Sequence, residues 1–555
     1  MNIYDKVPVK VQKKSGFDKS FQNLFTSKVG TITPILTDEL IPNTTVNLKM
    51  AISTQLPPLA SDTFMRVKQK YAAFFVPTRL LVSDYEKWLT GKKGEIGSQS
   101  YIPVMPEYRW QPSKDYDHFK PGSLADYLGY KVVEKSAAQI SSVTATTKVC
   151  ALPFLAYHRI YNDWFRNSLV QKDIYADEVG SAVACASLST RHFWYAETPS
   201  QYMTCDLGTT QNTAHSDLFN DGVRLWELRQ ANFGSDIYTS CTPQPQNGTA
   251  QSVSFRIPEA VGANGSFTIS ALRAANSMQQ FLERNNLAGN RLVDYVKAQY
   301  GANLSDSIAQ RPILLGAGSF DVYSKGIYQT MNAGDTAEAT NNPFSSVGSR
   351  YGSAYVDGQD LIIKGFTAQE PGYLMVVTWL SPKVTYSTGL DPMLDRYIGM
   401  NKQSDMANPI LQNVGNEPIY VKQLDSRYAY TNTVNTVFGY NDRYCNWKDK
   451  QDEVHGLLRD DSSLQSFALQ RTFDNDGVAN PAPAINSSFL QIPTTYLDQV
   501  SAVGNTISNY GYWSDTYFDY KVSMPLARYS IPSLQDPAYE HGEDIIIDRS
   551  GKQLS

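Results

Sequence analysis

The 555-residue sequence lacks a long hydrophobic run. Its longest apolar stretches cover residues 71–77 and 373–380, whereas a membrane-spanning helix needs about 20 predominantly apolar residues. The apolar core of a signal peptide is also missing, because residues 1–8 lead directly into lysines. We therefore predict a protein that is made and used in a cytoplasm and has no contact with a membrane.

Cysteine is scarce and histidine is scattered. The five cysteines are odd in number and show no C-x-x-C spacing; they are Cys150, Cys185, Cys205, Cys241 and Cys445. Such usage is typical of a reducing compartment and of free, mostly buried thiols. Cys445 and His455 are ten positions apart and do not resemble a zinc motif. We therefore predict neither a metal site nor a cofactor.

Catalytic and phosphate-binding motifs are missing as well. The sequence contains no Walker A loop, no H-E-x-x-H, no G-x-S-x-G and no dinucleotide-binding glycine fingerprint. Gly316 and Gly318 lack the context of a phosphate-binding loop, so we interpret them as a turn. Carboxylate pairs such as Asp115 with Asp117 are interpreted as surface loops, because nothing in the sequence pairs them across a cleft. We therefore predict no catalytic residue and no enzyme activity.

Charge is low, and its sign is slightly negative. Charged residues make up 19% of the chain, and 49 basic against 54 acidic residues give a net charge of -5. A protein that binds nucleic acid over its whole surface would be more positive. A local basic patch stands at the start, where residues 1–28 contain six lysines against two aspartates.

We predict that residues 1–28 form a basic N-terminal arm. Four of its lysines are candidates for contacts with nucleic acid phosphates: Lys6, Lys10, Lys13 and Lys14. Two other interpretations stay open. The arm could be a solvated terminus, or it could pack on another subunit as an added strand, because Val7, Val9 and Val11 alternate with other residues.

Aromatic residues, by contrast, are abundant. They make up 12% of the chain, with 35 Tyr, 23 Phe and 8 Trp. The 42% hydrophobic content excludes a disordered chain. Tyrosine has an apolar ring and a hydrogen-bonding tip, which suits broad contact surfaces. The composition therefore favours a folded protein that makes extensive protein contacts.

Short strand-like segments arrive at irregular intervals along the chain, and the few helices lie between them. The expected strands cover residues 29–36, 46–50, 64–76, 373–386 and 521–531. The expected helices cover residues 79–89 and 270–287, the second capped by Ser270 and interrupted at 287–289, and residues 152–169 are expected to form a further ordered block with one apolar face. Polar loop excursions are expected at about 90–121, 171–252 and 331–358. A parallel βαβ fold would alternate strand and helix regularly, so the pattern predicts a mainly β, antiparallel sandwich in which residues 29–555 form a single domain.

Several segments together resemble the major capsid proteins of the microviruses, most closely the gokushovirus-like branch. They occur in one order along residues 30 to 532: Thr33-Pro34-Ile35-Leu36, Phe74-Phe75-Val76-Pro77-Thr78-Arg79-Leu80, Leu152-Pro153-Phe154-Leu155-Ala156-Tyr157, Tyr238-Thr239-Ser240-Cys241, Leu272-Arg273-Ala274-Ala275, Arg311-Pro312, Pro371-Gly372-Tyr373, Gly439-Tyr440, Val454-His455-Gly456 and Ile531-Pro532. Each piece is weak alone. Their collinear order across nearly the whole chain carries the resemblance.

The resemblance implies an eight-stranded antiparallel jelly roll with long inserted loops. It also implies self-assembly into a small T=1 icosahedral shell around a circular single-stranded DNA genome, in a virion assembled in the cytoplasm of the bacterial host. The expected partners are further copies of the chain, the genome on the inner face, a small basic packaging protein, a scaffolding protein, a pilot protein and a host receptor that binds the outer loops.

One departure from the gokushovirus pattern concerns a long insertion that builds protrusions at the threefold axes. Only about twenty-five residues separate Pro245 from Ser270 here, so we do not expect a large protrusion from this position. We expect the polar excursion at 171–237 to decorate the exterior instead.

A second function stays open from the residues alone. A β-sandwich carbohydrate-binding or hydrolytic protein would use its aromatic residues as platforms for sugar rings. Such a protein would be a monomer in solution with sugar-dependent binding or activity.

Overall fold

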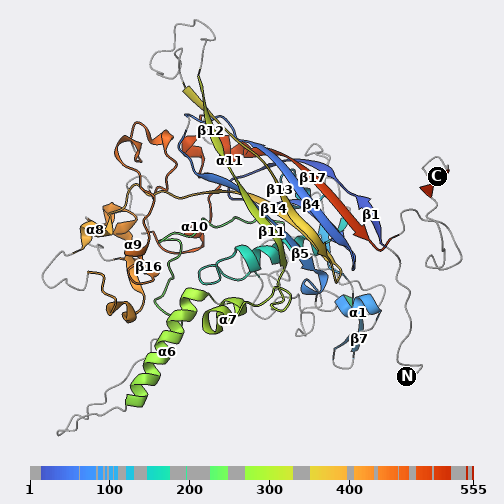
Figure 1. Cartoon of the computed structure of the whole chain (residues 1–555), viewed down its shortest axis with the longest axis horizontal. Coiled ribbons are helices and arrows are strands. Elements are labelled where there is room, and N and C mark those ends of the chain that lie inside the picture. The colour runs from blue at the N-terminus through green and yellow to red at the C-terminus, as the bar shows by residue number, and fades with distance from the viewer. Residues whose placement is uncertain are drawn as a thin grey trace, which may run out of the picture.

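The structure is a computed structural model of the whole chain (Figure 1). It describes residues 14–61, 63–82, 85–91, 94–96, 99–103, 105–110, 120–130, 147–174, 195–196, 226–247, 269–289, 291–328, 350–396, 406–429, 436–460, 462–473, 483–502, 506–526, 546–547 and 553–554. Within these residues no helix combines the length and apolar character needed to cross a membrane.

Two antiparallel sheets form the centre of the molecule (Figure 1). The larger has the strand order β1-β17-β4-β13-β12, and β2 also pairs with β17. Its strands are β1 (Ser15–Asp18), β2 (Phe21–Ser27), β4 (Thr45–Gln55), β12 (Tyr323–Tyr328), β13 (Arg350–Thr367) and β17 (Tyr512–Met524). The smaller sheet has the order β11-β5-β14-β3. Its strands are β3 (Thr33–Leu40), β5 (Val67–Pro77), β11 (Ile313–Asp321) and β14 (Gly372–Pro382). The predicted mainly β, antiparallel architecture with a few helices is confirmed.

The two sheets face each other across an apolar core. Along β4, buried and exposed residues alternate, as expected for a strand with one face on the core. The Phe75 ring of β5 lies 5.3 Å from the Phe366 ring of β13. The Thr54 hydroxyl of β4 donates a hydrogen bond to Gln69 Oε1 of β5 at 2.7 Å. Side chains from the two inner faces therefore interdigitate as in a β-sandwich.

A helical layer covers the other face of the smaller sheet. It consists of α5 (Leu152–Ile160) and the single-turn π-helix η2 (Tyr161–Phe165). The Trp164 ring lies 5.6 Å from that of Phe74 on β5, and the Phe165 ring lies 4.9 Å from that of Trp379 on β14. This layer explains why β5 and β14 are buried on both faces, as predicted for residues 71–76.

The chain moves between the sheets as it proceeds. Strands β2 and β4 belong to the larger sheet, whereas β3 and β5 belong to the smaller one. Later in the chain β11 and β14 lie in the smaller sheet, and β12, β13 and β17 lie in the larger one. Neighbours within a sheet are therefore mostly distant in sequence; β17 pairs with β4 across more than 450 residues.

Helices α6 (Ile269–Ala288) and α7 (Leu292–Tyr300) lie where the sequence predicted an interrupted helix. Gly289 has φ +115° at the break, and Gly301 ends α7 with φ +68°, backbone conformations that side-chain-bearing residues rarely adopt. Ser270 is not an N-cap, because α6 begins one residue earlier, at Ile269. The helix predicted at 79–89 is divided into the 3₁₀ turn η1 (Thr78–Leu80) and α1 (Tyr85–Thr90).

Two predicted loop excursions contain strands. The 90–121 region holds β6 (Gly94–Ile96), β7 (Gln99–Pro103) and β8 (Glu107–Trp110). Residues 350–358, placed in the 331–358 loop, belong to β13. The glycines of β13 suggested a loop. In the structure, however, a Cβ at Gly352 would lie 2.0 Å from the Ser61 carbonyl oxygen, so glycine is needed there because two backbone segments pass close to each other. Most of the 171–252 excursion lies outside the described residues.

The turn interpretation of Gly316 and Gly318 is wrong, because both lie within β11. The last predicted core strand is displaced. Residues 521–531 were expected, whereas β17 covers Tyr512–Met524, and residues 527–531 lie outside the described residues.

Part of the segment predicted as a basic arm belongs to the larger sheet. Strands β1 and β2 both pair with β17, with Phe17 opposite Val522 and Phe25 opposite Ser514. The Phe25 ring packs edge-on against Tyr512 at 6.5 Å. A boundary between arm and domain at residue 28 is therefore wrong, because the sandwich already includes residue 15.

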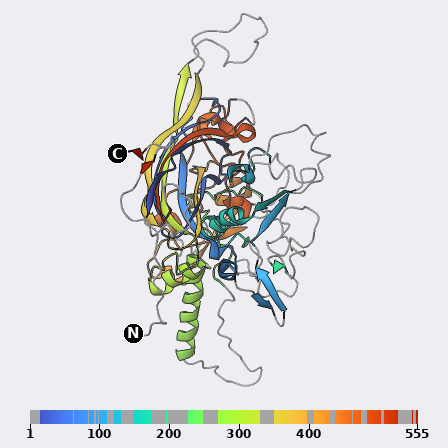
Figure 2. The same ribbon diagram turned by 90° about the vertical axis from the view of Figure 1, so that its right-hand side faces the viewer.

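The remaining elements are short and surround the sheets (Figures 1 and 2). They are α3 (Leu124–Tyr127), β9 (Thr147–Cys150), β10 (Tyr195–Ala196), α8 (Pro392–Asp395), η5 (Leu411–Val414), β15 (Glu417–Tyr420), η6 (Val421–Gln423), η7 (Ser426–Ala429), β16 (Val437–Asn441), α9 (Cys445–Lys448), η8 (Gly456–Leu458), η9 (Gln465–Phe467), α10 (Ser487–Leu490), η10 (Asp498–Val500), α11 (Thr506–Tyr510), β18 (Ile546–Ile547) and β19 (Gln553–Leu554). We call residues 384–471 the side lobe; α8, α9 and β16 mark it in Figure 1.

Candidate assembly surface

A row of exposed aromatic side chains crosses the outer face of the larger sheet. Trp513 of β17 stands opposite Gln55 of β4, Gln55 stands opposite Tyr355 of β13, and Tyr355 stands opposite Tyr323 of β12. Side chains alternate between the two faces of a strand, so the neighbours of Trp513 in β17, Tyr512 and Ser514, are buried. The rings of Trp513, Tyr355 and Tyr323 lie on the outer face, away from the core, and are 42–56% exposed.

Contacts within the sheet hold this aromatic row in place. Trp513 Nε1 donates a hydrogen bond to Gln55 Oε1 at 3.1 Å, and the rings of Tyr323 and Tyr355 lie 6.1 Å apart. A hollow of about 940 Å³, lined by Leu24 of β2 and Trp513, opens beside the row. Tyr and Trp are enriched at protein interfaces, and rings that are already positioned lose little entropy on contact.

The side lobe carries the second exposed apolar surface. Met393 and Leu394 of α8 are each 64% exposed, Leu457 of η8 is 62% exposed and Ile410, just before η5, is 78% exposed. Nearby, the Arg396 guanidinium lies 4.3 Å above the half-exposed Trp447 ring of α9. Exposed large apolar side chains contribute to a protein contact site where they form a patch.

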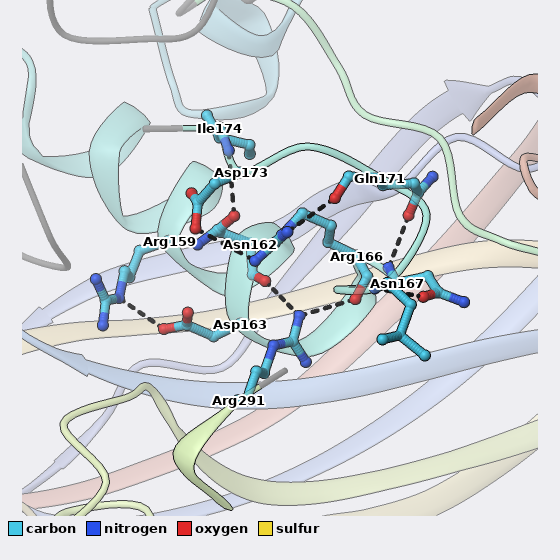
Figure 3. Close-up of polar contacts among 10 residues, drawn as sticks. Arg159, Asn162, Asp163, Arg166, Asn167, Gln171, Asp173, Ile174 and Arg291 are labelled. Carbon is cyan, nitrogen blue, oxygen red and sulfur yellow. Dashed lines mark hydrogen bonds and ion pairs between the residues drawn. The ribbon is translucent and has the colours of Figure 1, made fainter. Parts of the chain in front are cut away.

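A buried polar cluster attaches the α6–α7 helices to the sandwich (Figure 3). Arg291, the residue before α7, donates hydrogen bonds from Nη2 to the carbonyl oxygens of Asn162 at 2.6 Å and Arg166 at 2.8 Å. Arg166 in turn donates to the Gln171 carbonyl at 2.9 Å and pairs with Asp173 at 3.2 Å. The two carbonyl groups that accept from Arg291 belong to η2 (Asn162) and to the residue that ends it (Arg166). The cluster therefore fixes where α7 lies against the helical layer.

Arg159 and Asp163 form the most deeply buried ion pair of this cluster. Arg159 Nε lies 2.6 Å from Asp163 Oδ2, and the two side chains are only 3% and 15% exposed. Burial raises the pKa of the Asp163 carboxyl, even though Arg159 and Arg291 act in the opposite direction. Burial also lowers the pKa of Arg291, and the nearby Arg166 charge adds to this. A catalytic role does not follow, because both partners are enclosed and serve packing.

Of the four lysines predicted to contact DNA, the described residues include Lys14 alone. Lys14 is exposed, directly precedes β1, and donates from Nζ to the Thr45 hydroxyl at 3.2 Å. Lys6, Lys10 and Lys13 lie outside the described residues.

The predicted thiols and metal candidates are placed only in part. Cys241 and Cys445 are buried thiols and Cys150 is an exposed thiol, whereas Cys185 and Cys205 lie outside the described residues. Among the described residues, no three His, Cys, Asp or Glu side chains gather closely enough to hold a metal ion. Burial, followed by the charge of Glu417, raises the pKa of the Cys445 thiol to about 12.

The aromatic row and the side-lobe surface were not predicted from the sequence. A signal for the row existed, because Trp513 and Tyr517 are separated by an even number of positions and must share one face of a strand. Which face points outward depends on pairing with β4, more than 450 residues away.

Comparisons with known proteins place the chain among phage capsid proteins. The family described as "Capsid protein (F protein)" matches residues 5–260 and 256–534. The chain is 24% identical to capsid protein VP1 of Chlamydia phage 1, over 96% of this chain and 98% of the relative. It is 25% identical to capsid protein VP1 of Bdellovibrio phage phiMH2K, over 96% and 97% of the two chains. Capsid protein VP1 of Spiroplasma virus 4 is 23% identical, over 91% and 93%.

The match covers nearly the whole chain and includes every strand of the two sheets. Capsid proteins are structural components of the virion and build its shell from many copies. The predicted resemblance is confirmed: the chain belongs to the capsid protein (F protein) family and is a microvirus major capsid protein.

Proposed function

We propose that copies of this chain close into a small T=1 icosahedral shell around a circular single-stranded DNA genome, and that each copy contributes one jelly roll to the shell wall. The observation that carries the proposal is the strand order. In chain order, β2, β4, β13 and β17 fall in one sheet and β3, β5, β11 and β14 in the other. Two four-stranded sheets with these crossings support the proposed jelly roll.

Two strands of the larger sheet lie outside the proposed eight-stranded jelly roll. They are β1 and β12, which extend the sheet at its two edges. The proposed single domain then begins within the segment first assigned to the arm and runs to residue 555, and the basic arm is reduced to about residues 1–14. The excursions at about 90–121, 171–252 and 331–358 connect the strands and supply part of the contact surface.

Shell closure follows from repeated contacts between identical surfaces. A contact that repeats by rotation makes rings and then a closed shell when the rotation closes. Each copy touches several neighbours, so modest contacts combine through effective concentration into a stable particle. The aromatic row and the side lobe are the described surfaces best suited to this role, because they expose large apolar side chains.

Assembly of the purified full-length chain tests this proposal. Sedimentation velocity and light scattering at increasing protein concentration should show single chains giving way to one large species of uniform size. Met393→Asp in the side lobe should shift this transition to higher concentration, because it places a charge in an apolar contact. Met393→Leu, at the same exposed position, is the matched control for a substitution that adds no charge. A chain that stays single at every concentration would contradict the proposal.

Contact between the N-terminal lysines and the genome is a separate proposal. Lys6, Lys10, Lys13 and Lys14 would neutralise phosphates on the inner face, and each phosphate contact with single-stranded DNA contributes about 0.7 to the salt dependence of log K. Replacing all four with alanine should therefore flatten that dependence by about 3. The matched control replaces four exposed lysines elsewhere: Lys68, Lys383, Lys448 and Lys450. Equal slopes for the two quadruple variants would contradict the contact.

The other proposed partners follow from the charge and from the family. A chain with a net charge of -5 cannot neutralise a genome, so we propose a small basic packaging protein inside the shell. We also propose a scaffolding protein, a pilot protein, recognition of a host receptor by outer loops, and assembly in the cytoplasm of the bacterial host. The family is structural, which argues against the carbohydrate-binding or hydrolytic alternative.

A further inference from the structure

Among the residues that the structure describes, helix α6 packs against the rest of the molecule near its C-terminal end. Its 20 residues make it about 30 Å long, and in both overall views it extends away from the sheets (Figures 1 and 2). Near its C-terminal end the Phe281 ring lies 6.2 Å from that of Tyr295 in α7, and Asn286 Nδ2 donates to the Thr242 hydroxyl at 3.0 Å. At the other end Ile269 is 68% exposed and Leu272 is 47% exposed.

The projecting N-terminal turns of α6 need a packing partner to be stable as a helix. Short helical segments are marginal in water, and most helical stability in proteins comes from packing of one face. Between Ile269 and Gln280 the only charged residue is Arg273, so this end is neither a typical solvated surface nor a basic surface for nucleic acid. A protein surface that carries few charges is the cover that fits this composition.

One face of α6 repeats at a spacing of four and three residues. It contains Ile269, Arg273, Asn276, Gln280 and Glu283, which lie along one side of the helix. If a second helix packs along this side of α6, these five positions form the line of contact.

The C-terminal end of this face lies beside an exposed apolar segment. The Glu283 carboxylate lies so close to Gly415 that a Cβ there would be 2.7 Å from Oε1. Gly415 directly follows η5, and Val414 and Ile410 in and before η5 are 63% and 78% exposed. Glycine is favoured at this position for two reasons. A Cβ would collide with the Glu283 carboxylate, and the φ of +102° is one that other residues rarely adopt.

Arg273 and Glu283 carry opposite charges on this face but cannot meet within one helix. Ten residues separate them, which is about 15 Å along the axis. The Glu283 carboxylate accepts a hydrogen bond from Gln279 at 2.8 Å. A second α6 that lies antiparallel would bring each of these charges beside its opposite.

We propose that α6 packs antiparallel against α6 of a second copy, about a two-fold axis at the level of Met278. In this register Arg273 of each copy faces Glu283 of the other, and Asn276 faces Gln280. The exposed N-terminal turn of each helix, with Ile269 and Leu272, then lies beside η5 of the other copy. The contact is isologous, so each interaction forms twice. This inference rests on the proposed function and names the surface by which two copies meet.

Charge reversal tests the register. Arg273→Glu and Glu283→Arg should each raise the protein concentration needed for half-assembly about tenfold, because two attractive pairs become repulsive. The double variant R273E/E283R restores opposite charges and should assemble at close to the original concentration. The matched control is Lys297→Glu, the same change of charge at an exposed position of α7, which should assemble as the original chain does.

A cross-linking experiment gives a readout that does not depend on the effect of charge. In an equal mixture of Asn276→Cys and Gln280→Cys chains, the antiparallel register brings the new thiols together, so oxidation should join one chain of each kind. Disulfide formation mainly between two N276C chains would contradict the register.

Failure of this inference differs from failure of the proposed function. Particles that form equally well with R273E, with E283R and without either change would overturn the α6 contact and leave the shell standing. Chains that stay single before any substitution would overturn both. Weaker assembly of each single variant, with recovery in the double variant, supports both.

Discussion

At the scale of single residues, enclosed ion pairs contribute more to the stability of the fold than partly exposed ones. The Arg159–Asp163 pair is enclosed, so removing one partner leaves a buried charge without compensation. Asp163→Ala should lower the free energy of unfolding by about 3–5 kcal/mol. Asp173→Ala, whose carboxylate is 40% exposed and pairs with Arg166, should cost less than about 1 kcal/mol. Urea unfolding of the two variants checks this; equal losses would contradict the assignment.

The thiols provide a second test at this scale. A thiol reacts as the thiolate, and burial raises the pKa of Cys241 as well as that of Cys445. At pH 8 a thiol-specific reagent should therefore modify Cys150, which is exposed, well before Cys241 and Cys445. Peptide mapping by mass spectrometry identifies the modified residues. Modification of Cys241 at the rate of Cys150 would contradict the packing described here.

At the scale of the elements, glycines inside strands hold neighbouring parts close together. A Cβ at Gly318 of β11 would lie 2.2 Å from Tyr71 Oη. The Tyr71 ring cannot move away freely, because it stacks on Phe320 at 5.3 Å and its hydroxyl donates to Asp360. Gly318→Ala should therefore lower the free energy of unfolding by about 1–3 kcal/mol. Gly16→Ala in β1, with no atom within 4 Å, is the matched control and should have almost no effect.

The same glycines explain which elements the sequence could predict. Strands β4, β5 and β14 were found because apolar alternation or continuous apolar runs indicate burial directly. Strands β11 and β13 contain glycine where two backbones or a ring approach closely, and glycine also indicates loops. Strands β1 and β2 were missed because their partner, β17, lies almost 500 residues away.

At the scale of the whole molecule, the buried tyrosines set the alkaline limit of stability. Burial raises the pKa of Tyr127 to about 12 and raises the pKa of Tyr157 and Tyr512 as well. Below pH 10 these phenols are protonated in the folded and unfolded chain alike, so their contribution is complete. Above pH 10 the unfolded chain loses protons that the folded chain keeps, and stability falls.

We therefore expect a late absorbance step at 295 nm, from ionisation of these phenols, that coincides with the loss of circular dichroism above pH 10. Ionisation of all tyrosines around pH 10 with an unchanged circular dichroism spectrum would show that the rings are not enclosed as described.

The family and its structural role could be inferred from the sequence because short motifs keep one order along the chain. The contact surfaces could not. The aromatic row requires four strands brought together from distant parts of the sequence, and the side-lobe surface consists of apolar residues that a sequence alone would assign to the core.

Electron microscopy of the purified full-length chain at high concentration is the most direct test that these molecules build a container. We predict closed, hollow particles of one diameter, with the two-sheet sandwich forming the wall. Isolated molecules, or open fibres of variable length, would contradict this prediction.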